Sequence, residues 1–233
     1  LGPSGVIGNE SYLLAGRPFF NPQQAPQDPI VMLIQINPQN PQPRLIRKVV
    51  DTLRDGGVIA YPTDTFYGIG CDIMSKHAIE RIYQLKQRDK KNPFSFICSD
   101  LTTISSYAKV SNYAYKTMRR LLPGPYTFVL EGSRLVPKIM LTKRRTAGIR
   151  VPDNAICIAL VKELGNPILT TSAATPEGSV FHDPTLIQDY FGSRIDIVID
   201  GGIVAGEPSS VISLIDDVPE VIRRGMGDVS MFE

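Results

Sequence analysis

The sequence is poor in residues on which many enzymes rely for catalysis. It has no tryptophan, only two histidines (His77 and His182) and three cysteines, and none of these residues occur at the spacing of metal ligands. We therefore expect no metal site on the protein and no histidine-based nucleophilic catalysis. Cys71, Cys98 and Cys157 are widely spaced and odd in number, which favours reduced, buried thiols over a disulfide framework. His77 is expected to be an ordinary surface group.

The sequence also lacks common nucleotide-binding motifs, membrane-spanning segments and a large net charge. The chain contains neither a Walker sequence nor Gly-x-Gly-x-x-Gly. No apolar run approaches the ~20 residues needed to span a bilayer, and residues 6–20 are too often interrupted by polar residues to form a signal-peptide core. The formal net charge is only +2, so the field of the whole molecule gives no strong reason to expect a nucleic-acid partner. We expect a cytoplasmic protein without a membrane partner.

Residues 1–30 differ in composition from the rest of the chain. They contain nine glycines and prolines, which prevent a regular period and predict an irregular N-terminal arm. Residues 31–233 show no composition break, and a chain of 233 residues with 42% hydrophobic content can bury one sizeable core. We therefore predict a single domain over residues 31–233.

Hydrophobic periodicity predicts helices alternating with strands early in the chain and adjacent strands late. This pattern indicates an α/β (α+β) domain with a twisted mixed parallel and antiparallel sheet and helices packed on it. Helices are expected over residues 45–53, 78–85 (with Ser75 as the cap), 111–122, 154–164 and 184–191. Strands are expected over residues 58–61, 94–98, 126–130, 148–151, 168–171, 195–199, 211–215 and 221–223.

The most informative stretch runs from Gly56 to Asp72, where an apolar strand ends in hydroxyl groups and glycines. Pro62 cannot donate to a sheet ladder, so the strand over residues 58–61 should end where Thr63–Thr65 begins. In an open α/β sheet, ligands bind at such strand ends. We therefore expect part of the functional site here.

Cations and hydroxyl groups follow at other predicted strand ends, and the basic residues fall into two groups. Such a set suits a reaction that needs charge neutralisation and positioning more than proton transfer. Adenylyl transfer is one such reaction, because an ionised carboxylate-like nucleophile attacks the α-phosphorus of ATP and no strong general base is needed. Lysine and arginine would draw charge from the triphosphate, Mg²⁺ would bridge its oxygens, and pyrophosphate would leave. The two groups are Lys86, Arg88, Lys90 and Lys91, and Lys143, Arg144, Arg145 and Arg150.

The segment Tyr-Pro-Thr-Asp-Thr-Phe-Tyr-Gly-Ile-Gly over residues 61–70 closely resembles the opening motif of the YrdC/YciO-like family, whose best-known members are threonylcarbamoyl-AMP synthases. The resemblance extends from about Gln35 to Asp228. It is carried further by Lys86-Gln87-Arg88, Asn92-Pro93-Phe94, Pro123-Gly124-Pro125-Tyr126-Thr127, Thr146-Ala147-Gly148-Ile149-Arg150-Val151-Pro152, Thr171-Ser172-Ala173, Pro208-Ser209-Ser210-Val211 and Ile222-Arg223.

The resemblance implies a YrdC-like fold and a specific reaction. L-threonine and bicarbonate would form a carbamate, which attacks ATP to give threonylcarbamoyl-AMP and pyrophosphate, with Mg²⁺, for the t6A modification of tRNA. By motif position, the residues assigned to L-threonine are Thr65, Arg150, Ser172 and Ser209. Those assigned to ATP are Arg88, Asn92, Thr146 and Arg223. Those assigned to catalysis are Lys86, Arg88 and Ser172, with Lys86 near the phosphates.

The sequence departs from the synthases at three positions and looks closer to the YciO-like branch. Ala174 stands where the synthases carry the asparagine of Ser-Ala-Asn, Glu177 adds a carboxylate, and Ile97 replaces a common histidine. An unpaired buried partner of the missing amide would cost ~1 to 3 kcal/mol, or roughly tenfold to a hundredfold in a rate.

Other interpretations remain open at this point. Thr63 and Thr65 could bond backbone groups in a turn, and Lys86 and Arg88 could be a solvated helix end. A YciO-like paralogue could instead bind RNA or a nucleotide, with the two basic groups on a concave surface and Tyr67 and Tyr126 stacking on bases. A carbamoyl-adenylate domain like that of hydrogenase-maturation carbamoyltransferases is a third hypothesis. The oligomeric state is left open.

Overall fold

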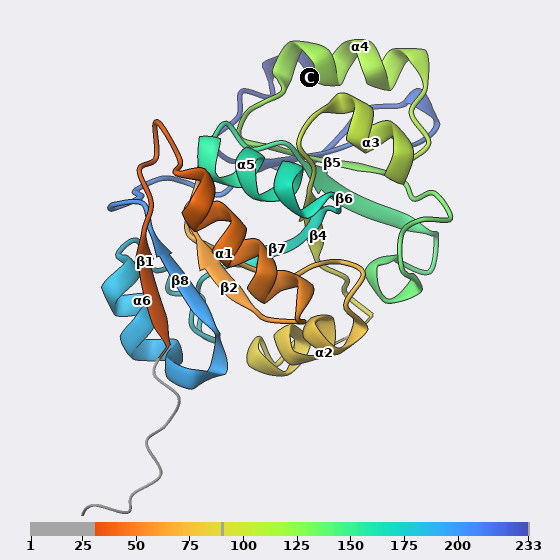
Figure 1. The fold of residues 1–233 in the computed structure, drawn as a ribbon. Coiled ribbons are helices and arrows are strands. Elements are labelled where there is room, and N and C mark those ends of the chain that lie inside the picture. Colours follow the sequence, from red (N-terminus) through yellow and green to blue (C-terminus); the bar gives the residue numbers. More distant parts are fainter. Residues whose placement is uncertain (1–30, 90, 233) are drawn as a thin grey trace, which may run out of the picture.

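The computed structural model of the chain describes residues 31–89 and 91–232. Within these residues, ten strands form one mixed sheet in the order β1-β8-β2-β3-β7-β4-β6-β5-β9-β10 (Figure 1). The strands are β1 (Met32–Gln35), β2 (Ile59–Tyr61), β3 (Gly68–Gly70), β4 (Ser95–Ile97), β5 (Tyr126–Glu131), β6 (Thr146–Arg150), β7 (Ile168–Ser172), β8 (Ile197–Asp200), β9 (Ser210–Ser213) and β10 (Glu220–Arg223).

Parallel and antiparallel pairs are mixed along the sheet. β8 pairs in parallel with both β1 and β2, β4 with β6, and β5 with β9, and the remaining neighbours are antiparallel. The predicted mixed sheet in a single domain is thus confirmed. The predicted arm over residues 1–30 lies outside the described residues, so its boundary stays a prediction.

The helices are α1 (Pro43–Arg54), α2 (Lys76–Leu85), α3 (Leu101–Tyr107), α4 (Asn112–Leu121), α5 (Ala155–Leu164) and α6 (Pro184–Phe191). Polar side chains fix where several of them begin. Ser75, Ser111 and Asn154 accept hydrogen bonds from backbone N–H groups in the first turns of α2, α4 and α5. Gly165 ends α5 in the left-handed conformation, with φ +80°. These start and stop signals agree with the sequence predictions.

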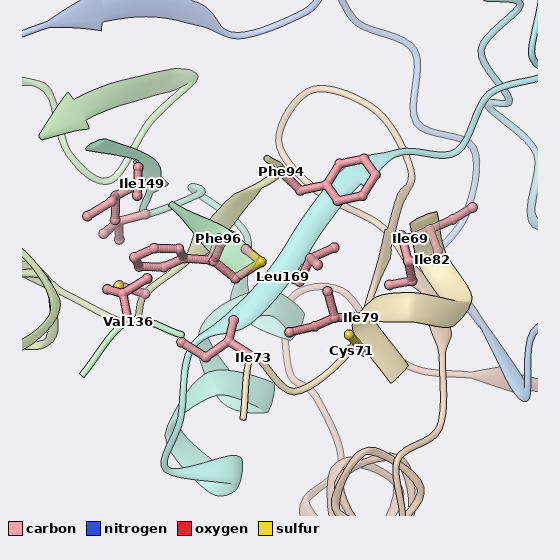
Figure 2. Close-up of a cluster of buried hydrophobic side chains, with 14 of the residues drawn as sticks. Ile69, Cys71, Ile73, Ile79, Ile82, Phe94, Phe96, Val136, Ile149 and Leu169 are labelled. Atoms are coloured by element: carbon pink, nitrogen blue, oxygen red, sulfur yellow. The ribbon is translucent and has the colours of Figure 1, made fainter. Parts of the chain in front are cut away.

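Two apolar clusters lie on opposite faces of the sheet, because successive strand residues point to opposite sides. In and beside β2, Val58 and Ala60 join one cluster, whereas Ile59 and Tyr61 join the other. The smaller cluster contains the inward residues of α1 and α5, which lie side by side (Figure 1). The larger cluster contains those of α2, α4 and α6, and Figure 2 shows part of it around β4 and β7.

Three elements were not predicted from the sequence: β1, β3 and α3. β3 is only three residues long and contains Gly68 and Gly70, which favoured a loop. A Cβ atom at Gly70 would lie 2.2 Å from the Leu169 carbonyl oxygen, so the close approach of β7 requires glycine at this position. α3 is rich in serine and threonine and begins at Asp100, whose side chain accepts from the Thr103 N–H.

No helix among the described residues combines the length and the apolar character needed to cross a bilayer.

Candidate active site

A cavity of about 460 Å³ lies on the face of the sheet that α1 and α5 cover elsewhere. Ser95 of β4 lines it, whereas Ile97 on the same face packs in the α1 and α5 cluster. In β5, Thr127 and Val129 face the cavity, while the alternate residues of that strand are core. β6 follows the same rule, because Thr146, Gly148 and Arg150 line the cavity and Ile149 is core, although Ala147 is both core and lining. This stripe with a period of two, largely polar apart from Val129, was the signal that sequence reasoning overlooked.

The cavity brings together every predicted site residue except Lys86. They come from the loop after β2, the α2–β4 loop, β6, β7, the approach to β9, and β10. The residues brought together are Thr65, Arg88, Asn92, Thr146, Arg150, Ser172, Ser209 and Arg223. Their assignments to particular ligands remain predictions.

The inner end of the cavity is formed by Arg150 and Thr65, which are both buried. Arg150 Nη2 donates to Thr65 Oγ1 at 3.1 Å and to Asp64 Oδ1 at 2.7 Å. Arg150 Nε is buried without a hydrogen-bond partner in the described structure. The sequence did not assign a role to Asp64, which supplies the counterion that a buried arginine needs.

The neighbouring hydroxyl of Thr63 has a structural role. Its Oγ1 donates to the Phe66 carbonyl at 2.6 Å and accepts the N–H groups of Thr65 and Phe66. The turn interpretation is therefore correct for Thr63. For Thr65, the side chain instead faces Arg150.

A second cluster joins Ser209, Thr127 and Arg223. The hydroxyls of Ser209 and Thr127 are 2.9 Å apart, and Arg223 donates to the carbonyl of Ser209 through Nε at 3.1 Å and Nη2 at 2.7 Å. Burial lowers the pKa of Arg223, and the nearby charge of Arg150 lowers it further. Two arginines thus approach one another, an arrangement that an anion would relieve.

Lys86 lies at the end of α2 and does not line the cavity. Its ammonium group donates to the carbonyls of Ala174 at 2.8 Å and Ser172 at 3.2 Å, which tie it to the segment after β7. Burial lowers the pKa of Lys86, and the charge of Arg88 lowers it further. Arg88 itself lies over the Phe94 ring, 4.7 Å from its centroid.

The cavity is electropositive. Arg88, Lys91, Arg150 and Arg223 are among its lining residues, which include no aspartate or glutamate. Nor do the described residues contain a cluster of three side chains suited to a metal ion. This donor set does not fit a cation held by the protein, so any Mg²⁺ would enter as part of an anionic substrate.

The segment 201–209 passes beside the inner end of the cavity. Tyr67 Oη donates to the Gly202 carbonyl at 2.7 Å and accepts from the Gly201 N–H at 3.2 Å, and His182 Nδ1 lies 2.7 Å from the Val204 carbonyl oxygen. A Cβ atom at Gly206 would lie 2.4 Å from the Thr65 carbonyl oxygen. These contacts hold the segment that leads to Ser209 beside the cavity, and they were not predicted from the sequence.

The proposed stacking of bases on Tyr67 and Tyr126 is wrong. Both rings are buried, and the Tyr126 hydroxyl donates to the Asp228 carbonyl at 3.1 Å. Of the two basic groups, Lys143, Arg144 and Arg145 are exposed, and Lys90 lies outside the described residues. His77 is exposed, and all three cysteines are free and buried, as predicted.

Comparison with known proteins matches this architecture to one family. The Sua5/YciO/YrdC family model, described as "Telomere recombination", matches residues 51–225. YciO of Escherichia coli K12 is 46% identical over 200 residues, which cover 84% of this chain and 97% of that protein. The threonylcarbamoyl-AMP synthase of Vibrio vulnificus is 31% identical over 161 residues, which cover 68% of this chain and 87% of the synthase.

Solved structures agree. The crystal structure of E. coli YciO matches with a TM-score of 0.83 and 43% identity, covering 88% of this chain and all of that one. Sua5 of Pyrococcus abyssi complexed with L-threonine matches with a TM-score of 0.78 and 28% identity, covering 84% of this chain and 58% of that one. The sequence, the sheet and the cavity at its strand ends together show that the chain belongs to the Sua5/YciO/YrdC family.

Proposed function

We propose that the protein is an ATP-dependent adenylyltransferase that forms L-threonylcarbamoyl-AMP for tRNA modification. The observation that carries the proposal is one cavity in which the buried pair of Arg150 and Thr65 faces a rim of further cations. A carboxylate suits the inner end, and a triphosphate suits the rim. Relatives named as threonylcarbamoyl-AMP synthases and a Sua5 structure complexed with L-threonine support L-threonine as the substrate.

In this proposal the inner end binds L-threonine. Arg150 would donate hydrogen bonds to the carboxylate. Thr65 and Ser209 line the same cavity, and their hydroxyl groups would orient the amino acid. The neutral amine of L-threonine combines with bicarbonate to give the N-carboxylate and water. The carbamate is already ionised, so its attack on phosphorus needs no base.

The rim residues Arg88, Asn92, Thr146 and Arg223 would bind ATP. A carbamate oxygen forms a bond to the α-phosphorus, the bond from that phosphorus to the bridging oxygen breaks, and pyrophosphate leaves with the electron pair. Arg88 and Arg223 stabilise the charge on the phosphates, and the α2–β4 loop and β10 that hold them supply the positioning. Mg²⁺ would arrive bound to the phosphates.

Position 174 is one of the three positions at which this chain differs from the synthase pattern. Ala174 is buried, and its carbonyl already accepts from Lys86. An asparagine side chain there would add a donor and an acceptor beside the end of β7 without removing this backbone contact. We therefore expect Ala174→Asn to raise the rate of product formation by about tenfold.

The test is mass-spectrometric detection of threonylcarbamoyl-AMP after incubation with L-threonine, bicarbonate, ATP and Mg²⁺. The wild type and Ala174→Asn should form it. Arg150→Met should not, whereas Arg47→Met, at an exposed position of α1, serves as the matched control and should match the wild type. Absence of product from both the wild type and Ala174→Asn would overturn the proposal.

A further inference from the structure

Asp64 makes contacts that the proposed reaction does not use. It follows β2, and its side chain is only 8% exposed. Its Oδ1 accepts from Arg150 Nη2 at 2.7 Å, and its Oδ2 accepts from the Asp153 N–H at 3.1 Å. Asp64 therefore joins the loop after β2 to the segment between β6 and α5. It is not among the described residues that line the cavity, so it lies behind Arg150 as seen from a ligand.

Arg150 differs electrostatically from the other cations of the cavity. Within the described residues, Arg88, Lys91 and Arg223 form no ion pair with a carboxylate, whereas Arg150 and Asp64 form a buried one. The rim thus carries uncompensated positive charge, and the inner end is nearly neutral overall. A buried arginine without this counterion would be strongly destabilising.

We propose that Asp64 is a positioning residue that fixes Arg150 and neutralises the inner end, so that this end accepts a monocarboxylate and phosphates stay at the rim. The proposal deepens the function proposed above and rests on it for the identity of the carboxylate. Asp64 accepts a hydrogen bond from Arg150 Nη2 and so holds the guanidinium group in one orientation. Arg150 Nε remains without a partner, so directional hydrogen bonding, more than net charge, would bind the ligand.

The neutral inner end also limits which anions can bind there. A phosphate group carries more charge than a carboxylate and gains most where cations lack counterions. In the wild type such sites are at the rim. Removing the Asp64 carboxylate leaves Arg150 as an uncompensated cation, and a small anion in solution can then take the place of the missing side chain.

The experiment measures thermal unfolding of the full chain with sodium formate and with sodium chloride at equal ionic strength. Asp64→Ala should melt below the wild type, and its melting temperature should rise saturably with formate but not with chloride. In the wild type formate can bind only where the substrate carboxylate would, so its melting temperature should rise much less than that of Asp64→Ala at the same formate concentration. Asp51→Ala is the matched control, because Asp51 is an exposed carboxylate in an ion pair with Arg54 on α1, and it should respond no more than the wild type does.

The KM values for L-threonine and ATP distinguish this positioning role from a merely structural one. In Asp64→Ala, the KM for L-threonine should rise at least about tenfold while the KM for ATP stays within about twofold, and formate should reverse most of the change. Equal increases in both KM values would overturn the inference. So would a melting temperature that responds to formate no more than to chloride.

Two further results keep the inference separate from the proposed function. If formate stabilises Asp64→Ala specifically but neither the wild type nor Ala174→Asn forms threonylcarbamoyl-AMP, the role of Asp64 stands and the reaction is wrong. If Asp64→Ala does not fold, Asp64→Asn is compared with Asp64→Asn combined with Arg150→Met. The double variant should melt higher because the uncompensated charge is gone, and a double variant that melts no higher overturns the inference.

Discussion

The Tyr67 hydroxyl group connects the core to the segment 201–209 beside the cavity, and the substitution Tyr67→Phe tests this connection by removing one oxygen atom. Its ring is fully buried, and its hydroxyl exchanges two hydrogen bonds with the backbone of Gly201 and Gly202. Tyr67→Phe keeps the packing of the ring and removes both bonds. The segment 201–209 would then be held by the contacts of Val204 with His182 and by the bonds of Ser209 with Thr127 and Arg223.

The expected cost follows from these contacts. Each hydrogen bond contributes about 0.5 to 1.5 kcal/mol net, and the exposed Gly202 can be rehydrated, so we expect a loss of about 1 to 2 kcal/mol. For a chain of this length, that corresponds to a fall in melting temperature of about 2 to 8 °C. Since Ser209 belongs to the same segment, the KM for L-threonine should also rise.

Differential scanning calorimetry and amide hydrogen exchange measure the two parts of this prediction. Exchange should accelerate at Val204 and Gly206 in Tyr67→Phe and stay unchanged in α5. Burial raises the pKa of Tyr67 to about 12, so the stability difference between the two proteins should be constant from pH 6 to about 9. An unchanged melting temperature together with unchanged exchange in the segment 201–209 would refute the reasoning.

Three further predictions concern other parts of the molecule. Gly148→Ala should lower stability by about 1 to 3 kcal/mol and raise the KM for ATP, because the new Cβ would lie 2.5 Å from Ser95 Oγ on the cavity floor; unchanged urea unfolding would contradict this. Lys86→Met should lower the melting temperature and kcat together, because the segment after β7 loses two charge-assisted bonds, and Lys86→Arg should recover part of the stability. Burial raises the pKa of all three cysteine thiols. The stability that the buried neutral thiols contribute is therefore complete below about pH 8.5 and falls as the pH rises further. A free energy of unfolding in urea that stays constant from pH 8 to 11 would count against this prediction. The cysteines are Cys71, Cys98 and Cys157.

Much of the fold could be predicted because local signals agreed with one another. Serine and asparagine caps, Gly165 and the apolar periodicity placed α2, α4, α5 and α6 to within a residue or two. β1 and β3 were not predicted, because the formation of short strands depends on the neighbouring strands more than on their own residues. The glycines of β3 suggested a turn, although the proximity of β7 explains Gly70.

The site was harder to predict, because its contacts join residues distant in sequence. Nothing local indicated that Asp64, 86 positions away, would supply the counterion of the buried Arg150. Lys86 was expected near the phosphates, and its contacts with the carbonyls of Ser172, at the end of β7, and Ala174, just after it, depend on the sheet order. The alternation of polar and apolar residues in β5 and β6 did mark the cavity face.

The position of the histidines narrows the reactions that the cavity can support. His77 is exposed on α2, and His182 contacts Val204 and the Phe66 ring, so neither lines the cavity in the described structure. The lining residues also include no carboxylate. Among the described residues, a reaction that begins with proton abstraction by a histidine or a carboxylate would therefore lack its base in the cavity. Transfer of a nucleotide to an already ionised nucleophile needs positioning and charge neutralisation, and arginine, lysine and hydroxyl groups at strand ends provide both.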